Sequence, residues 1–255
     1  MTQGNSPIAL ITGGSRGLGR SMALHLADRG VDLVITYNQN SAAADDVVQQ
    51  IQAKGRQAVA LQLNAADSSS FGAFAERLQG ELTKTFGRER FDYLVNNAGT
   101  GLHKPLAETT EEEFDSLMKL HVKGPFFFTQ KLLPLLNDGG RVLNISSGLA
   151  RFTLPGYGAY AMMKGAIEVL TRYQAKELGA RKITVNTLAP GAIETDFGGG
   201  TVRDNKQVNA MVASMTTLGR VGLPDDIGAA VAMLLSPDSA WITAQRIEVS
   251  GGQSI

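Results

Sequence analysis

The sequence of 255 residues contains no cysteine, which excludes disulfide bonds, thiolate zinc sites and a thiol nucleophile. Neither sign of charge dominates, because 24 basic residues balance 24 acidic ones, and such a surface gives no reason to expect a nucleic-acid partner. Three histidines are present, His25, His103 and His121, and no two of them share the i,i+4 spacing of one helix face. No metal site is therefore expected.

Long hydrophobic runs are missing as well. No apolar stretch approaches the roughly 20 residues that a membrane-spanning helix needs. Residues 1–7 lack the basic and apolar regions of a signal peptide. We therefore expect no membrane partner and a cytoplasmic location. Hydrophobic residues make up 43% of the chain and charged residues 19%, which is typical of a globular protein.

Short apolar runs alternate with amphipathic stretches along the chain. The runs predicted as strands are Ile8–Thr12, Val31–Tyr37, Ala58–Leu63, Phe91–Asn96, Arg141–Ser146, Ile183–Ala189 and Arg246–Val249. Helices are predicted near residues 17–29, 41–54, 69–86, 111–136, 158–179 and 225–235, several of them ending at a glycine. This alternation predicts an α/β protein, a three-layer doubly wound Rossmann fold with a mostly parallel seven-stranded sheet. No linker composition interrupts it, so residues 1–255 are expected to form a single domain.

A glycine-rich segment joins the first predicted strand to the first helix. Gly13, Gly17 and Gly19 have the spacing Gly-x3-Gly-x-Gly. Gly13 permits a sharp turn, Gly17 lets the backbone approach a ligand, and Gly19 lets the helix pack closely on the strand. The N–H groups at the start of that helix can then bind a pyrophosphate. The segment predicts a dinucleotide site, and the alternative is a turn with no ligand.

A second pattern places three polar side chains together. Tyr160 and Lys164 stand four residues apart on a predicted helix, and such residues share one helical face. Ser147 precedes Tyr160 by thirteen residues and follows a predicted strand. A Tyr-x3-Lys pair alone is common on exposed helices. The serine at this distance indicates that the three side chains act together.

These motifs, in this order, resemble the short-chain dehydrogenase/reductase family from about Ile8 to the C-terminus. The resemblance implies hydride transfer between a nicotinamide cofactor and a small carbonyl compound or alcohol. Tyr160 would act as general acid or base, while Lys164 and the oxidised nicotinamide lower its pKa from about 10. Lys164 would also bind the nicotinamide ribose, and Ser147 would orient the substrate oxygen. Its neighbour Ser146 is interpreted as a strand-end residue bonded to the backbone.

One position departs from the family pattern. Relatives carry Asn in an Asn-x2-Gly-x-Phe segment, and here His121 stands at that position before Gly124 and Phe126. The resemblance implies a role for the main-chain carbonyl of this residue, which holds a water leading to the active-site lysine. On that basis His121 is a catalytic candidate. The alternative is a packing residue without a role in proton transfer.

The end of the second predicted strand bears on the choice of cofactor. An NAD site usually carries Asp or Glu there, and this chain has no carboxylate between Tyr37 and Asp45. Arg16 resembles the arginine of NADP-using relatives, and Asn38 and Ser41 can donate hydrogen bonds to a phosphate. NADP(H) is therefore favoured over NAD(H). The alternative for Arg16 is a solvated surface charge.

By the same resemblance the cofactor site extends to other strand ends. Asn64 would lie near adenine, Ile193 would present its backbone to the carboxamide, and Thr195 its hydroxyl to a phosphate. The expected cofactor contacts are Gly13, Ser15, Arg16, Gly17, Leu18, Gly19, Asn38, Ser41, Asn64, Asn97, Ala98, Gly99, Tyr160, Lys164, Pro190, Gly191, Ile193 and Thr195.

Residues 196–217 contain three successive glycines and are predicted to form a mobile lid over the substrate pocket. Residues 100–104 and 151–157 would form its other sides, around a medium-sized, partly apolar carbonyl compound. Two alternatives remain open. A 3-oxoacyl-[acyl-carrier-protein] reductase needs a basic docking surface, for which Lys176, Arg181 and Lys182 are candidates. A non-catalytic dinucleotide sensor has no need of all three catalytic side chains.

The resemblance also implies a homotetramer. In that assembly the helices near 111–136 and 158–179 would pack against those of a neighbouring subunit, and residues 245–255 would form a second contact. The helix that bears Tyr160 also carries Ile167, Val169, Leu170 and Tyr173, which spread too widely for one buried stripe.

Overall fold

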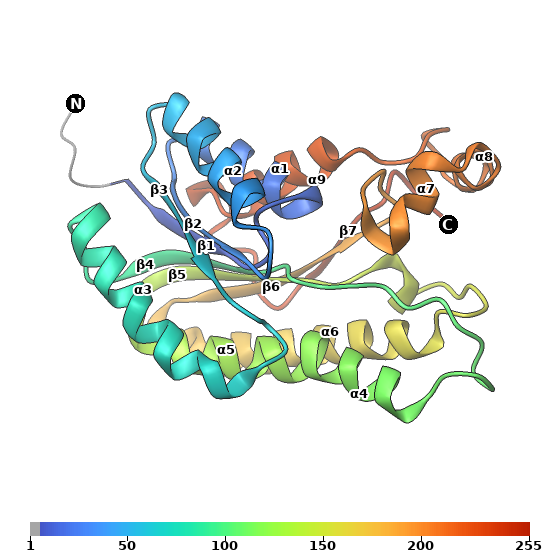
Figure 1. Cartoon of the computed structure of the whole chain (residues 1–255), viewed down its shortest axis with the longest axis horizontal. Helices are drawn as coiled ribbons and strands as arrows, with labels where there is room; N and C mark the ends of the chain where they lie inside the picture. The colour runs from blue at the N-terminus through green and yellow to red at the C-terminus, as the bar shows by residue number, and fades with distance from the viewer. Residues whose placement is uncertain (1–5) are drawn as a thin grey trace.

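The computed structural model describes residues 6–255 and contains one parallel seven-stranded sheet, in the order β3-β2-β1-β4-β5-β6-β7 (Figure 1). The strands are β1 (Ile8–Ile11), β2 (Asp32–Tyr37), β3 (Ala58–Gln62), β4 (Phe91–Asn96), β5 (Leu136–Ile145), β6 (Thr184–Pro190) and β7 (Arg246–Val249). The predicted fold class is confirmed. The strand order reverses between β1 and β4, and ligands of such sheets bind at the carboxyl ends of the strands beside this reversal. Residues 1–5, part of the segment expected to lack a signal peptide, lie outside the described residues.

Helices cover both faces of the sheet (Figure 1). On one face lie α1 (Gly17–Asp28), α2 (Ser41–Ala53) and α9 (Pro224–Leu234); on the other lie α3 (Phe71–Phe86), α4 (Glu111–Met118), α5 (Gly124–Leu132) and α6 (Gly158–Leu178). Each face has its own apolar core, with Leu26, Val47 and Ile227 on the first and Phe74, Leu132 and Leu178 on the second. The short helical turns are η1 (Ser68–Ser70), η2 (Lys119–Lys123), η3 (Leu133–Leu135), η4 (Gly148–Ala150), η5 (Gly179–Arg181), η6 (Phe197–Gly200) and η7 (Pro237–Ser239).

The helix expected over residues 111–136 is not continuous. It is divided by the π-helical turn η2, and β5 begins at Leu136, before the expected Arg141. Pro125 has no N–H to donate to the carbonyl of His121, four residues earlier, so a regular α-helix cannot pass this point. Because β5 begins at Leu136, Gly139 lies within this strand, with a φ of 75°, and does not end a helix as predicted.

The glycines at the ends of three other helices do adopt the left-handed conformation, with φ of 83° at Gly30, 76° at Gly55 and 66° at Gly87. Gly179 does not: its φ is −58°, and the chain turns three residues later at Lys182, whose φ is 56°. A lysine in this conformation is strained relative to glycine. The turn after α6 is therefore set by its surroundings and not by a local glycine.

The expected lid is folded into η6, α7 (Thr201–Asp204) and α8 (Lys206–Ser214), beside the carboxyl ends of the strands (Figure 1). It is tied to the segment that follows β6, because Asn209 donates a 2.7 Å hydrogen bond to Glu194 and Arg203 forms an ion pair with Asp196. The mobility of this lid remains a prediction.

Candidate active site

The glycine turn is built so that its backbone can approach a ligand. Gly13 and Gly17 have φ of 68° and 52°, and a Cβ atom on Gly19 would lie 2.2 Å from the carbonyl oxygen of Gly13. The turn is fixed to the end of β2 by bonds from the N–H groups of Gly13 and Gly14 to Thr36, of 3.1 and 2.8 Å. The N-cap residue Arg16 makes no capping bond with its side chain, and the first turn of α1 carries no acidic residue. Its N–H groups are therefore available to an anion.

Across from this turn lies the segment that follows β6. Among residues 6–255, the only side chain within 4 Å of a Cβ atom on Gly17 would be that of Thr195, at 3.7 Å. Ser15 and Leu18 belong to the same turn as Gly17. Between the turn and Thr195, a pyrophosphate would meet backbone N–H groups and a hydroxyl, which are the donors it requires. The residues present therefore fit a dinucleotide.

Asn97 has a structural role in this arrangement. Its Nδ2 atom donates to the carbonyl oxygens of Thr12 and Gly13, at 2.8 and 3.2 Å, and so joins the end of β4 to the glycine turn. Ala98 lies against the turn as well, since a Cβ atom on Gly13 would lie 3.1 Å from its Cα. Gly99 follows and packs against His121. This segment therefore supports the glycine turn through the side chain of Asn97 and the close packing of Ala98.

The end of β2 presents neutral donors and one cation. Arg16, Asn38 and Ser41 are exposed there, and Arg16 forms no ion pair with any residue in the range 6–255. Asn64, at the end of β3, is also exposed, and its Oδ1 atom accepts a bond from the N–H of Ala66 at 3.1 Å. Its Nδ2 atom makes no hydrogen bond within that range. These residues fit a phosphorylated adenosine.

Tyr160 lies in α6 and is 6% exposed, and the side chain of Ser147, two residues after β5, is close enough to lower its pKa. Burial raises the pKa of Tyr160 far above its ordinary value of 10.0, and the Ser147 side chain offsets only part of this. The expectation that Lys164 lowers this pKa is not met in the protein alone, because desolvation of the phenolate dominates. Tyr160 is therefore protonated at neutral pH.

Lys164 is buried beside this tyrosine, with its Nζ atom 5.5 Å from the centre of the Tyr160 ring. The Nζ atom donates a 2.8 Å hydrogen bond to the carbonyl oxygen of Ile145. Burial lowers the pKa of Lys164 to about 8, so the side chain still carries its charge through most of the neutral range. A cation is thus held next to the phenol without a direct bond to it.

His121 lies in the π-helical turn η2 and is 1% exposed. Its Nε2 atom is 2.8 Å from the carbonyl oxygen of Thr100, and its ring stands edge-on to Tyr160 with centres 5.4 Å apart. Burial, followed by the charge of Lys164, lowers the pKa of His121 to about 3. The imidazole therefore stays neutral at neutral pH, which argues against a titrating role for this side chain.

A small cavity of about 10 Å³ adjoins His121. It is lined by Asn96, Ala98, His121, Pro125, Asn144, Ile145, Lys164 and Ile167. This volume has room for about one water molecule, and the lining supplies polar groups to bind it. The cavity lies between the interrupted helix and Lys164. The resemblance implies a water at this place, held by the main-chain carbonyl of His121.

Two strand residues below the site form a buried polar row. Asn96 donates to Asn144 at 2.8 Å, and Asn144 donates to Thr171 of α6 at 2.9 Å. Ser146 donates to Glu168 at 2.8 Å and to the carbonyl oxygen of Lys164 at 3.2 Å, which agrees with its expected structural role. The sequence analysis did not single out Asn144 as a structural residue, although an asparagine within an apolar strand is a signal for such a row.

Aromatic side chains lie beside Tyr160, where the substrate is expected to bind. The Phe197 ring, from η6, lies 5.8 Å from that of Tyr160, and the rings of His103 and Tyr157 lie 4.7 Å apart. The N–H of Lys104 donates to the carbonyl oxygen of Gly156 at 2.7 Å. The segments 100–104 and 151–157 therefore meet beside Tyr160, where the sequence analysis placed the walls of the pocket.

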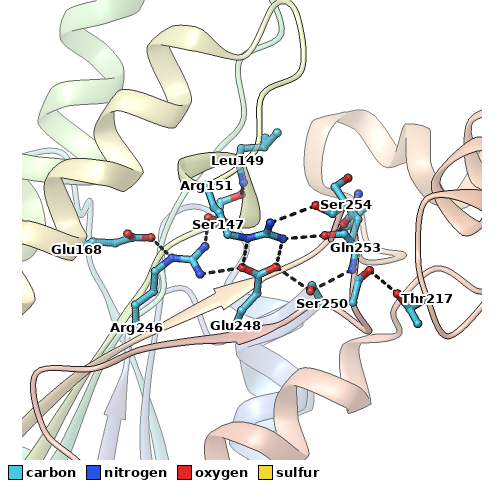
Figure 2. Close-up of polar contacts among 12 residues, drawn as sticks. Ser147, Leu149, Arg151, Glu168, Thr217, Arg246, Glu248, Ser250, Gln253 and Ser254 are labelled. Carbon is cyan, nitrogen blue, oxygen red and sulfur yellow. Dashed lines mark hydrogen bonds and ion pairs between the residues drawn. The ribbon is translucent and has the colours of Figure 1, made fainter.

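A charge network behind Ser147 was not expected from the sequence (Figure 2). Arg246 in β7 pairs with Glu168 at 2.7 Å and with Glu248 at 2.8 Å, and it reaches the carbonyl oxygen of Ser147 at 3.4 Å. Arg151 pairs with Glu248 through two bonds of 2.7 Å. The alternation Arg-Ile-Glu-Val in β7 places Arg246 and Glu248 on one face of the sheet, and that was the available signal.

Within residues 6–255, no group of His, Asp and Glu side chains is arranged to hold a metal ion. In the same part of the chain, no helix is long and apolar enough to cross a membrane.

Comparison with known proteins relates residues 13–254 to a family model described as enoyl-(acyl carrier protein) reductase. A hydroxynaphthalene reductase-like protein, Arp2 of Metarhizium brunneum, is 38% identical, and the alignment covers 96% of this chain and 94% of that protein.

Two solved structures are similar in both sequence and shape. The angucycline C-6 ketoreductase LanV, crystallised with bound NADP, has a TM-score of 0.92 and 35% identity, over 97% of this chain and 95% of that one. The reductase LugOII, described as catalysing keto-reduction at C1 during lugdunomycin biosynthesis, has a TM-score of 0.93 and 36% identity over 100% of both chains.

Proposed function

Because the chain belongs to the short-chain dehydrogenase/reductase family, we propose that it interconverts a ketone and its alcohol with NADP(H). The observation that carries this proposal is the meeting of Ser147, Tyr160 and Lys164 beside the glycine turn, at the carboxyl ends of the central strands. Each of the three has a distinct chemical role.

Tyr160 acts as the general acid in reduction. Its hydroxyl gives a proton to the developing alkoxide, and Ser147 orients the substrate oxygen towards it. The reduced nicotinamide, when bound, supplies the hydride. Lys164 stabilises the phenolate that remains and binds the nicotinamide ribose, and the water cavity beside His121 provides a route for the replacement proton. Burial keeps Tyr160 protonated at neutral pH, which favours the direction of reduction.

The cofactor preference rests on the end of β2. Arg16, Asn38 and Ser41 offer a cation and neutral donors to a 2′-phosphate, and no carboxylate is present to bind a free ribose hydroxyl. The similarity to LanV, whose crystals contain NADP, supports the same choice.

The substrate class that we propose is a ketone on a fused aromatic ring system. Two of the relatives are named for hydroxynaphthalene and angucycline compounds, which have such rings. The aromatic side chains of Phe197, Tyr157 and His103 would stack against a planar ligand next to Tyr160. This is narrower than the medium-sized, partly apolar compound that the sequence predicts.

The acyl-carrier-protein reductase is less well supported. Of its three candidate docking cations, Arg181 is bonded to Asp138 and to the carbonyl oxygens of Leu133 and Leu136. The Arg181 side chain therefore stabilises the start of β5 through these bonds. The non-catalytic sensor is disfavoured because the three catalytic side chains converge.

We propose that residues 1–255 form one domain with a lid near 196–217 and that four copies assemble. Exposed apolar side chains on α4, α5 and α6 support the assembly, and they are Met118, Phe126, Phe127, Met162, Val169 and Tyr173. A groove of about 440 Å³ lies between α4 and the start of α6, lined in part by Phe114 and Met162. The cytoplasmic location stays a prediction.

The direct test is turnover of a panel of ketones with NADPH and with NADH. The panel contains fused-ring aromatic ketones, simple aliphatic ketones and a 3-oxoacyl thioester. The proposal expects the highest kcat/KM for a fused-ring ketone with NADPH. Preference for the thioester would favour the carrier-protein reductase, and no turnover of any ketone would favour the sensor.

A further inference from the structure

The residues Ser250–Ser254, which we call the C-terminal clasp, contact three separate parts of the active site. These parts are the segment after β6, the turn after Ser147 and the segment that leaves the lid. Figure 2 shows the contacts with Arg151 and Thr217. All three parts lie far from the clasp along the sequence.

The first contact is made by Gln253, whose side chain is buried. Its Oε1 atom accepts a 2.8 Å hydrogen bond from the N–H of Ala192. A Cβ atom on Gly191 would lie 2.8 Å from the same oxygen, so glycine at that position allows the close approach. The N–H of Gly191 also donates to the carbonyl oxygen of Val249 at 3.1 Å. Ala192 directly precedes Ile193, whose backbone is assigned to the nicotinamide carboxamide.

The second contact is made by Arg151, in the turn after Ser147. Besides its pair with Glu248, its guanidinium donates to the carbonyl oxygens of Gln253 and Ser254, at 2.8 and 3.1 Å (Figure 2). Arg151 holds the pKa of Glu248 down to about 2, so this pair stays charged at neutral pH. The clasp is thereby fixed to the turn that carries the catalytic serine.

The third contact is with the segment that leaves the lid. The N–H of Leu218 donates to Gly251 at 3.1 Å, the hydroxyl of Thr217 to Gly252 at 2.9 Å, and the N–H of Ser254 to Met215 at 2.9 Å. Gly251 and Gly252 both have positive φ, and a Cβ atom on Gly252 would lie 2.7 Å from the Thr217 hydroxyl. The clasp therefore needs glycine at these positions.

We propose that Gln253 is a positioning residue, which holds the backbone of residues 190–195 in the conformation that receives the nicotinamide end of the cofactor. It acts through the N–H of Ala192 and does not itself touch the cofactor. The part of this inference that concerns the cofactor rests on the proposed function, whereas the part that concerns the backbone does not.

The test compares Gln253→Leu with Gln245→Leu. Gln245 is an exposed glutamine whose side chain, within the described part of the chain, bonds only to the carbonyl oxygen of Thr243, so the same substitution there is a matched control. Gln253→Glu serves as the conservative variant, since it keeps an acceptor oxygen for the N–H of Ala192. Amide hydrogen exchange is measured without cofactor. The dissociation constants of NADPH and of adenosine 2′,5′-bisphosphate are measured by fluorescence and calorimetry.

In Gln253→Leu we expect faster exchange over residues 190–195 and a dissociation constant for NADPH that is raised roughly tenfold or more, because a buried N–H loses its acceptor. Adenosine 2′,5′-bisphosphate, which lacks the nicotinamide half, should bind as it does to the wild type. Gln253→Glu should restore both values in large part, and Gln245→Leu should change neither.

Unchanged exchange over residues 190–195 in Gln253→Leu would overturn the inference, as would equal weakening of NADPH and the bisphosphate. If the wild-type protein bound neither ligand, the proposed function would fail, and the exchange rates alone would still decide whether Gln253 holds this backbone.

Discussion

Lys164 donates its 2.8 Å hydrogen bond to the carbonyl oxygen of Ile145, and not to the hydroxyl of Tyr160 on its own helix. The bond fixes the cation at the end of β5, two residues before Ser147. In the proposed mechanism the lysine acts on the phenol through its charge and binds the nicotinamide ribose with its remaining N–H groups.

Ser147 and Ser146 are adjacent but should respond differently to substitution by alanine. Ser147→Ala removes the group that orients the substrate oxygen, and we expect kcat to fall by about 10²–10³. Ser146→Ala removes bonds to Glu168 and Lys164, so it should lower the free energy of unfolding by about 1–3 kcal/mol with a much smaller change in kcat. Steady-state kinetics and urea unfolding on both variants measure this contrast. Equal loss of kcat in the two would contradict the assignment of Ser147.

Arg16→Ala should discriminate between the two nicotinamide cofactors. A charge-assisted bond to a phosphate contributes about 1.5–3 kcal/mol, so the dissociation constant of NADPH should rise roughly ten- to a hundredfold, and that of NADH little. Arg20→Ala is the matched control, because Arg20 lies in the first turn of α1, the helix that begins after Arg16, and bonds to Gln50. Fluorescence titration with each cofactor measures the effect. Equal weakening of both would mean that Arg16 supports the turn and does not bind the phosphate.

His121 makes the protein less stable in acid. Burial lowers its pKa from 6.5 to about 3, so between these values the unfolded chain binds a proton that the folded chain does not. The free energy of unfolding should therefore fall as the pH decreases below 6.5, and by about 2 kcal/mol at pH 5 relative to pH 7. His121→Asn should lose this component, whereas His103→Asn, at an exposed histidine, should keep it. Urea unfolding at the two pH values measures the difference, and an unchanged dependence in His121→Asn would show that His121 is not the group responsible.

The assembly should depend on the outer faces of the long helices. Tyr173 and Val169 in α6 are 65% and 45% exposed in the single chain. Light scattering at micromolar concentration should report about four chains per particle, because burial of such side chains favours association. Tyr173→Glu should produce smaller particles with lower activity, because it places a charge on this apolar face. A fully active wild-type monomer would show that these faces have another explanation.

The strands and the glycine turn were predictable because each depends on a short stretch of sequence. β-Branched runs and Gly13, Gly17 and Gly19 act through local sterics, and the structure contains all seven strands. The break at His121 was not predicted, although Pro125 carried the information, because the apolar periodicity continues through it. The start of β5 at Leu136, five residues before the predicted Arg141, was also missed.

The C-terminal clasp could not be predicted from the sequence, for a different reason. Arg151 and Glu248 are far apart along the chain, and each alone is typical of a solvated surface charge. Only the packing of β7 beside β6 brings them together. In the protein without cofactor the pKa of Tyr160 is raised, because burial, which cannot be judged from the spacing of Tyr160 and Lys164, is the dominant effect. The lowering expected with the oxidised nicotinamide bound stays a prediction.

The measurement that tests the central claim most directly is the single-turnover rate of Tyr160→Phe with saturating NADPH and the best ketone of the panel. The substitution removes the proton but leaves the ring and its contact with Phe197 in place. NADPH should bind with nearly its wild-type dissociation constant, and reduction should fall by at least about 10²-fold, as for loss of a general acid. Reduction at a near-normal rate, with NADPH bound, would contradict the assignment of Tyr160 as the proton donor.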